Sequence, residues 1–283
     1  MNRVLFFLVK SLAFLPVDWL SALGKWISFI LKTVNYRHAI ILKNLSRSFP
    51  NKKTEQIQLI VTDFYNFLGR LIAESIKLFN ISKYTLSQRT TFVNDDLLKP
   101  YLEQDQEVIV VMGHYGNWEW ALLASSIHFD TEMIGIYKPL SSPFWNRKLH
   151  ELRSQYGATL LSMKESTRHL LKKSHSSRLI GIIADQTPSA QEINHWIPFL
   201  NQKTPVFLGA EKLAKKLQCP VFYASVSPQK FGYYKITFEL VSTFPNEYTD
   251  GEITLLHSKK LEQSIKNSPA YWLWSHRRWK HQK

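Results

Sequence analysis

The stretch Val108-Ile-Val-Val-Met-Gly-His-Tyr-Gly-Asn-Trp-Glu-Trp120 decides the fold. It begins as a run of apolar, mostly β-branched residues and then passes through a short turn that contains two glycines. Such a run, closed by a turn, predicts a buried strand over residues 107–112. Asn117 is a favoured N-cap residue, so a helix is expected to start directly after it. The strand therefore delivers His114 to the mouth of a helix.

Strands and helices alternate on both sides of this stretch, from about residue 90 onward. The expected strands cover residues 107–112, 132–137, 159–161, 179–184, 220–226 and 233–240. The expected helices cover residues 118–127, 145–156, 164–173, 206–217 and 252–266. This alternation predicts an α/β fold with a mainly parallel central sheet flanked by helices. Ligands of such sheets bind at the carboxyl ends of the strands, which is where His114 lies.

The N-terminal residues 4–31 are the most apolar part of the chain, but Pro16 and several charges interrupt them. A helix that spans a bilayer needs roughly 20 mostly apolar residues with few charges, and no window here meets that condition. We therefore expect two short helices, broken at Pro16, that lie in or dip into one leaflet. The alternative is a pair of helices packed in the core. This divides the chain into membrane-associated N-terminal helices, residues 1–34, and a single α/β domain, residues 35–283.

Charge narrows the choice of partners. The chain has 36 Lys and Arg against 22 Asp and Glu, which gives a net charge of +14. This excess favours a polyanionic partner, such as nucleic acid, anionic lipid headgroups or an acidic protein. A basic nucleic-acid-binding protein would explain the charge. However, no recognition motif is present, and this alternative leaves the apolar N-terminus unexplained.

Several classes of enzyme are excluded by missing motifs. The chain has no Gly-x-Ser-x-Gly nucleophile turn and no glycine-rich nucleotide loop. It has no His-Glu-x-x-His pair, and its one cysteine, Cys219, rules out a cysteine-based zinc site or a disulfide framework. We therefore predict neither a metal nor a cofactor.

The spacing of His114 and Glu119 suggests acid–base chemistry. Glu119 falls in the first turn of the expected helix, where the helix dipole favours a carboxylate. One turn of backbone would bring this carboxylate against the far nitrogen of His114. An imidazole held in one tautomer by a carboxylate is suited to take a proton from an alcohol. The same spacing also occurs among ordinary core and surface histidines, so the pair alone does not establish catalysis.

The sequence resembles the late acyltransferases of lipid A biosynthesis, the lauroyl- and myristoyltransferases of the lysophospholipid acyltransferase superfamily. The segment Gly113-His-Tyr-Gly-Asn-Trp-Glu119 matches the His-x4-Asp/Glu block of that family. Further matches follow in order along the chain at Tyr36-Arg37, Asn44-Leu45, Ser48-Phe-Pro50, Glu74, Arg153 with Gly157, Ala184-Asp-Gln186 and Trp274-Ser-His-Arg-Arg-Trp-Lys280. The resemblance implies a glycerolipid-acyltransferase-like fold over nearly the whole chain.

The resemblance also implies a reaction, in which a fatty acyl group passes from acyl carrier protein, or from a coenzyme A thioester, to a hydroxyl of a lipid A precursor. His114 would be the general base and Glu119 its orienting partner. Arg153 would stabilise the oxyanion or grip an acceptor phosphate. The alternative for Arg153 is a solvated cation on a helix face.

The remaining candidate substrate-binding residues are Asn117, Asp185 and Gln186. Asp185 and Gln186 follow the strand expected over residues 179–184, so they should reach the same sheet edge as His114. Asp185 would contact the acceptor headgroup, or it would serve only as a turn and helix cap.

Two departures from related patterns bear on the acceptor. Tyr137-Lys-Pro139 replaces a Tyr-Arg-Pro that the family often carries, so a bidentate contact there is lost. Ala184-Asp-Gln-Thr-Pro188 stands where glycerol-phosphate acyltransferases have Pro-Glu-Gly, which argues against a simple glycerol-phosphate acceptor. Another lipid acceptor, a lysophospholipid or an amino-acid lipid, is the alternative.

The expected partners are acyl carrier protein, a lipid A precursor and a phospholipid surface, without nucleic acid. The expected location is the cytoplasmic face of the cell inner membrane. Three basic clusters, residues 168–173, 212–216 and 277–283, are candidate docking surfaces for acidic partners, although such clusters are more often solvated helix faces.

Overall fold

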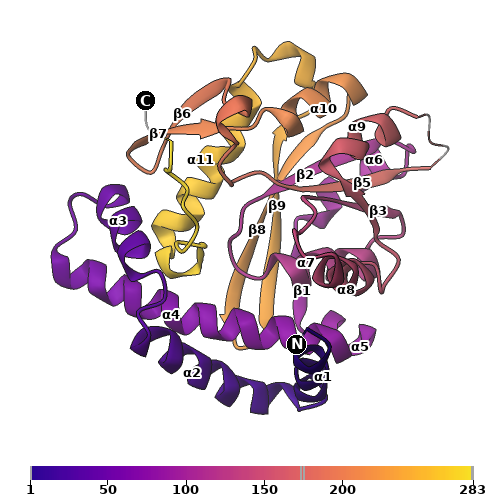
Figure 1. Cartoon of the computed structure of the whole chain (residues 1–283). Coiled ribbons are helices and arrows are strands. Elements are labelled where there is room, and N and C mark those ends of the chain that lie inside the picture. The colour runs from indigo at the N-terminus through magenta and orange to yellow at the C-terminus, as the bar shows by residue number, and fades with distance from the viewer. Residues whose placement is uncertain (1, 173, 175, 282–283) are drawn as a thin grey trace.

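A seven-stranded sheet runs through the centre of the molecule in the order β1-β9-β8-β2-β5-β3-β4 (Figure 1). Strands β8, β2, β5, β3 and β4 are parallel, whereas β9 and β1 run the opposite way. The strands are β1 (Thr90–Val93), β2 (Glu107–Met112), β3 (Glu132–Tyr137), β4 (Thr159–Ser162), β5 (Arg178–Ile183), β8 (Val221–Lys230) and β9 (Tyr233–Ser242). A separate antiparallel hairpin joins β6 (His195–Phe199) to β7 (Gln202–Val206). This computed structural model describes residues 2–172, 174 and 176–281.

Helices cover both faces of the sheet. They are α1 (Asn2–Ala13), α2 (Val17–Thr33), α3 (His38–Ser48), α4 (Thr54–Lys77), α5 (Lys83–Ser87), α6 (Lys99–Leu102), α7 (Trp118–His128), α8 (Pro143–Arg153), α9 (Met163–Leu170), α10 (Gly209–Leu217) and α11 (Glu252–Asn267). Along β2, Val108 and Val110 pack into the cluster that contains α7, while Ile109 and Val111 pack into the one that contains α4, α10 and α11. Successive side chains of a strand point to opposite faces, so burial on both sides explains why residues 108–112 of β2 are all apolar.

The predicted α/β fold with a mainly parallel sheet is confirmed. The six expected strands all form, and their ends differ from prediction by a few residues at most, except that β8 extends to Lys230. The pattern missed β1 at the sheet edge and the hairpin β6–β7, both of which are short and partly polar. The helix expected over residues 206–217 starts only at Gly209, because Val206 belongs to β7. Helix α9 ends at Leu170, and Lys173, the last residue of the helix expected there, lies outside the described residues.

Helices α1 and α2 break at Pro16, as expected, and α2 lies along α4. The close approach of α2 and α4 depends on Gly69, since a Cβ there would lie 2.3 Å from the carbonyl oxygen of Gly24. Lys77 of α4 donates from Nζ to the carbonyl oxygens of Ala13 and Leu15, 2.9 and 3.0 Å away. The junction between α1 and α2 is thereby fastened to α4.

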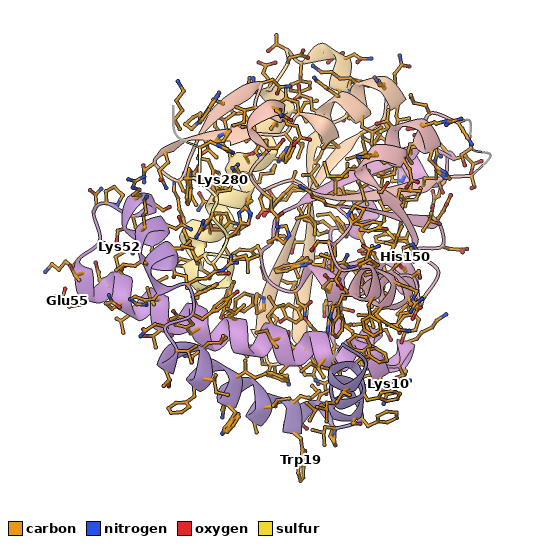
Figure 2. All side chains as sticks on the ribbon, in the orientation of Figure 1. Lys10, Trp19, Lys52, Glu55, His150 and Lys280 are labelled. Atoms are coloured by element: carbon orange, nitrogen blue, oxygen red, sulfur yellow. The ribbon has the colours of Figure 1, made fainter. Side chains whose placement is uncertain are left out.

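The opposite face of α1 and α2 carries large apolar side chains in solvent. Trp19 is 69% exposed, and Figure 2 shows it pointing away from the molecule. The others on this face are Phe7, Leu8, Phe14, Trp26, Phe29 and Val34. One face of this helix pair therefore packs on α4, as the core-packing interpretation expects, while insertion of the other face into a leaflet stays a prediction. Within the described ranges, no helix combines the length and the apolar character needed to cross a membrane.

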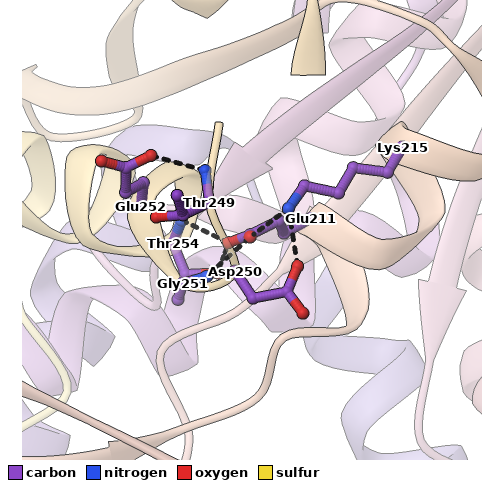
Figure 3. Close-up of polar contacts among 7 residues, drawn as sticks. All are labelled: Glu211, Lys215, Thr249, Asp250, Gly251, Glu252 and Thr254. Atoms are coloured by element: carbon purple, nitrogen blue, oxygen red, sulfur yellow. Dashed lines mark hydrogen bonds and ion pairs between the residues drawn. The ribbon is translucent and has the colours of Figure 1, made fainter. Parts of the chain in front are cut away.

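A polar cluster fixes the start of α11 against α10 (Figure 3). The buried carboxylate of Glu211 accepts hydrogen bonds from the backbone N–H of Gly251 at 2.7 Å and from both the N–H and the hydroxyl of Thr254. Lys215 bridges Glu211 and Asp250. These contacts fix the start of α11, and thereby the position of the helix face that lies beside the site described next.

Candidate active site

The site forms where β2 and β5 end side by side. These neighbouring parallel strands pair Met112 with Ile183, and the ladder continues with a bond from the N–H of Ala184 to the carbonyl of Met112. His114 and Asp185 each come two residues after the last paired residue of their strand. Equal spacing from the same register brings the two side chains together at the carboxyl edge of the sheet, as predicted for Asp185 and His114.

Asp185 holds His114 at two points. Its Oδ1 lies 2.6 Å from Nδ1 of the imidazole, and its Oδ2 accepts the backbone N–H of His114 at 2.8 Å. The indole N–H of Trp272 donates to the same Oδ2 at 2.7 Å. Burial alone would raise the pKa of Asp185, but the charge of His114 and these hydrogen bonds outweigh it and lower that pKa to about 2. The carboxylate is therefore ionised at neutral pH.

The ionised Asp185 sets the tautomer of His114. A carboxylate only accepts hydrogen bonds, so we assign the ring proton to Nδ1, which leaves a lone pair on Nε2. Nε2 lies 3.1 Å from the side-chain nitrogen of Gln186, and the indole of Trp118 packs edge-on against the ring. The His114 side chain keeps 15% of its surface exposed. The arrangement is that of a general base whose free nitrogen is reachable from outside.

Glu119 does not contact His114, so that prediction is wrong. Its carboxylate binds the guanidinium of Arg153 through two bonds, Nε to Oε2 at 2.8 Å and Nη2 to Oε1 at 2.5 Å. Burial lowers the pKa of Arg153, but the hydrogen bonds and charge of Glu119 raise it further than burial lowers it. This bidentate pair joins the first turn of α7 to the last turn of α8. The position expected for Glu119 is occupied by Asp185 instead.

Asn117 caps α7 as predicted, since its side-chain oxygen accepts the N–H of Trp120 at 3.0 Å. Its amide nitrogen donates to the carboxylate of Glu74, 2.9 Å away, and the residue has no exposed surface. Both ends of the amide are used within the protein, contrary to the prediction that Asn117 binds substrate. Glu74 itself also accepts the N–H of Gly232 and the hydroxyl of Tyr234, and burial raises its pKa.

The turn between His114 and α7 is sealed by the C-terminal segment. The carbonyl of His114 accepts the N–H of Leu273, and the N–H of Gly116 donates to the carbonyl of Tyr271. Gly116 has φ +65, and a Cβ at this position would lie 1.9 Å from the carbonyl oxygen of Val226. Only glycine fits there, since both the backbone conformation and the contact exclude a side chain.

A profile of the family described as bacterial lipid A biosynthesis acyltransferase matches residues 4–281. The chain belongs to that family. It is therefore an acyltransferase, and the resemblance read from the sequence is confirmed over nearly the whole chain. Among curated proteins, none matches the chain.

An apolar groove of about 450 Å³, the space open to the centre of a water molecule, lies beside the candidate site between α2, α4 and the C-terminal segment. It is lined by Leu31, Tyr36, Arg37, Leu68, Ile72, Leu273, Ser275 and His276. His276 lines this groove and belongs to the same C-terminal segment as Trp272, whose indole N–H donates to Asp185. Burial lowers its pKa to about 4, so His276 is neutral at neutral pH.

The sequence alone did not predict the buried residues that surround the candidate site. No contact with Asp185 was predicted for Trp272, although a buried indole N–H needs a partner and the ionised Asp185 supplies one. Glu74 and His276 were quoted only as matches to the family, and Arg278 only there and in the basic cluster over residues 277–283. Among the described residues, no group of three or more His, Cys, Asp and Glu side chains is arranged to hold a metal ion.

Proposed function

We propose that this acyltransferase moves a fatty acyl chain from an acyl thioester, carried by acyl carrier protein or coenzyme A, to a hydroxyl of a lipid A precursor. Nε2 of His114 takes the hydroxyl proton while the oxygen attacks the thioester carbonyl. The tetrahedral intermediate then collapses, the carbon–sulfur bond breaks, and the imidazolium returns its proton to the departing thiolate. The ester forms and the thiol leaves, so atoms and charge balance.

One observation carries this proposal, namely the contact between Nδ1 of His114 and the ionised Asp185. It leaves Nε2 as an acceptor and stabilises the imidazolium that forms during proton transfer. Gln186 occupies Nε2 in the free protein, so the acceptor hydroxyl replaces that amide when it binds. A positioned base of this kind contributes about 10²–10⁴-fold to the rate.

Arg153 remains our candidate for the developing oxyanion or an acceptor phosphate. Glu119 takes Nε and Nη2 of its guanidinium, which leaves Nη1 for a ligand. The bidentate pair also fixes the plane of the guanidinium, and a donor held in place before the reaction stabilises a developing charge best. Glu119 is thus proposed as the residue that positions Arg153, in place of its expected role beside His114.

The apolar groove beside His276 is the proposed site of the acyl chain. Its walls are mostly apolar, and Leu273 in its lining is hydrogen-bonded through its N–H to the carbonyl of His114. A chain lying in the groove would therefore end close to the base. Apolar surface buried there stabilises the bound donor by about 0.8 kcal/mol per methylene.

The proposed location is the cytoplasmic face of the inner membrane, where the exposed apolar face of α1 and α2 would enter one leaflet. Trp and Phe side chains on that face suit the bilayer interface. The net charge of +14 favours an acidic carrier protein and an anionic lipid. Arg168, Lys212, Arg277 and Lys280 of the three basic clusters are exposed, while Lys173 and Lys283 lie outside the described residues.

The test is incubation of the purified protein with defined acyl thioesters and candidate acceptors, followed by mass spectrometry of the lipids. We expect one added acyl chain on a lipid A precursor and loss of that product in His114→Ala. Retained turnover in His114→Ala would show that His114 is not the base. Acylation of a lysophospholipid or an amino-acid lipid, with the lipid A precursor left unchanged, would replace the acceptor but keep the chemistry.

A further inference from the structure

A small cavity is lined in part by Asp185. It has a volume of only about 10 Å³ open to the centre of a water molecule. Most of its walls are apolar, but the side chains of Asp185, His257, Ser258, Tyr223 and Arg278 also line it. A space of this size holds about one water molecule, so no lipid, phosphate or acyl group enters it.

Arg278 brings an uncommon feature into this cavity, a buried cation without a direct partner. The residue is only 2% exposed, and Nε and Nη1 of its guanidinium have no hydrogen-bond partner among the described residues. Burial lowers the pKa of Arg278, while the charge of Asp185 raises it, and the result is about 10. The guanidinium therefore stays positively charged at neutral pH.

An isolated buried charge is costly, and it is tolerated where an opposite charge lies near. Asp185 is the anion that lines the same cavity. The chain also fixes the backbone at this point, because the hydroxyl of Thr187 donates to the carbonyl oxygens of Arg277 and Arg278. The segment that carries Arg278 is thus tied to the same loop that carries Asp185.

We propose that Arg278 is a positioning residue of the acyltransferase, which offsets the charge of Asp185 from behind and so keeps His114 an uncharged base. This inference rests on the proposed role of His114. Asp185 would then act between two partners, with His114 on the substrate side and Arg278 on the cavity side. Arg278 touches neither substrate nor the reacting atoms.

The titratable groups around Asp185 and Arg278 come from several elements of the fold. Asp185 follows β5, His114 follows β2, and His276 and Arg278 belong to the C-terminal segment. Helix α11 contributes His257, whose pKa burial lowers to about 4, and β8 contributes Tyr223, whose pKa burial raises. The Glu119–Arg153 pair on α7 and α8 is internally balanced. Two further charged groups act on the neighbouring histidines, Glu211 on His257 and Lys280 on His276.

Removing the cation has a defined consequence. Without Arg278, the full negative charge of Asp185 acts on the imidazole and favours its protonated form. We expect Arg278→Met to raise the titration midpoint of His114 by about one pH unit. Arg278→Lys places a smaller cation farther from Asp185, so its shift has the same sign and is smaller. Arg278→Gln, which is polar but carries no charge, should shift the midpoint as Met does.

The experiment follows the imidazole signals of His114 by NMR across pH in histidine-labelled full-length protein, with the signals identified by their loss in His114→Asn. Arg277→Gln, one residue away and exposed, is the matched control and should leave the midpoint in place. The acidic limb of the pH–rate profile should move by the same amount. An unmoved midpoint in whichever Arg278 variants fold, Lys included, overturns the inference.

The two proposals fail in different ways. If His114→Ala keeps its activity, the assigned base is wrong whatever the NMR titration shows. If His114→Ala is inactive and the Arg278 variants leave the midpoint unchanged, the base stands and the role of Arg278 falls. The titration needs no substrate, so it does not depend on the identity of the acceptor.

Discussion

Oδ1 of Asp185 lies 2.6 Å from Nδ1 of His114, and the two residues come from loops that follow adjacent parallel strands. Asp185→Asn should keep this shape, since the side chains are nearly equal in size. The amide offers no charge to stabilise the imidazolium, and its NH₂ group can favour the wrong tautomer. We expect kcat to fall by about 10²–10⁴-fold in a thioester assay. A rate within twofold of wild type would show that His114 works without Asp185.

The bidentate pair of Glu119 and Arg153 predicts strong coupling in stability. Either Glu119→Gln or Arg153→Met alone leaves a largely buried partner without its counter-ion, which should lower the free energy of unfolding by about 3 kcal/mol. The double variant Glu119→Gln/Arg153→Met removes both charges and should lose less than the sum of the two. Urea unfolding of all four proteins measures this coupling. Additive effects would contradict a direct pair.

Acid should destabilise the protein through His257. Burial lowers its pKa in the folded protein to about 4, against 6.5 in the unfolded chain. Below pH 6.5 the unfolded chain therefore binds a proton that the folded protein does not, so stability falls as the pH drops from 6.5 toward 4. His257→Gln should reduce the stability difference between pH 7 and pH 4.5 by about 2–3 kcal/mol. Chemical denaturation at the two pH values measures it.

The control for this experiment is His150→Gln, which removes a histidine from the exposed face of α8 (Figure 2). It should leave the same stability difference unchanged. His276, whose pKa burial also lowers to about 4, supplies a second contribution of the same sign that persists in His257→Gln. An equal pH dependence in His257→Gln and wild type would show that His257 titrates normally.

The crossing of α2 and α4 should tolerate no methyl group at Gly69. A Cβ there would lie 2.3 Å from the carbonyl oxygen of Gly24 and 2.7 Å from the N–H nitrogen of Ser28, so the helices must separate. Gly69→Ala should lower the free energy of unfolding by about 1–3 kcal/mol. Gly209→Ala is the control, because no atom lies within 4 Å of its Cβ, and its effect should stay within about 0.5 kcal/mol. Equal stabilities of the two variants would refute the close crossing.

Membrane binding should depend on the exposed face of α1 and α2. Trp19→Glu places a charge where an indole is proposed to enter the bilayer, and we expect binding to vesicles of phosphatidylethanolamine and phosphatidylglycerol to fall about tenfold. Phe244→Glu makes the same change of charge at a similarly exposed aromatic residue, at the end of β9 away from the α2 contact. Co-sedimentation should separate the two variants. A similar loss in both would indicate charge repulsion alone.

The local pattern around Val108–Trp120 was enough to predict the strand, the turn and the capped helix, because burial on both faces of β2 and the cap at Asn117 leave direct marks in the sequence. It was also enough to place Asp185 at the sheet edge of His114. The adjacency of β2 and β5 could not be read from the chain, since strand order depends on how the crossovers pack. Without it, Glu119 was the nearest carboxylate in sequence and was assigned the contact that Asp185 makes.

The contacts of Trp272 and Arg278 were beyond sequence reasoning for a similar reason. Trp272 contacts Asp185 and Arg278 lines the same cavity as Asp185, which lies roughly 90 positions earlier in the chain, and such long-range neighbours follow no periodicity. The basic cluster over residues 277–283 was predicted only as a candidate docking surface for acidic partners. In the structure, Trp272, Trp274 and Arg278 are buried, and the segment packs against the site.

The seal that Tyr271 and Leu273 place over the turn at His114 has a consequence for the newly made chain. During translation the sheet and its histidine leave the ribosome well before this segment does. Until it arrives, Asp185 lacks the indole of Trp272 and the carbonyl of His114 lacks its partner. A nascent or prematurely ended chain that lacks residues 271–278 therefore holds His114 and Asp185 without these partners, and we expect no transfer activity from it.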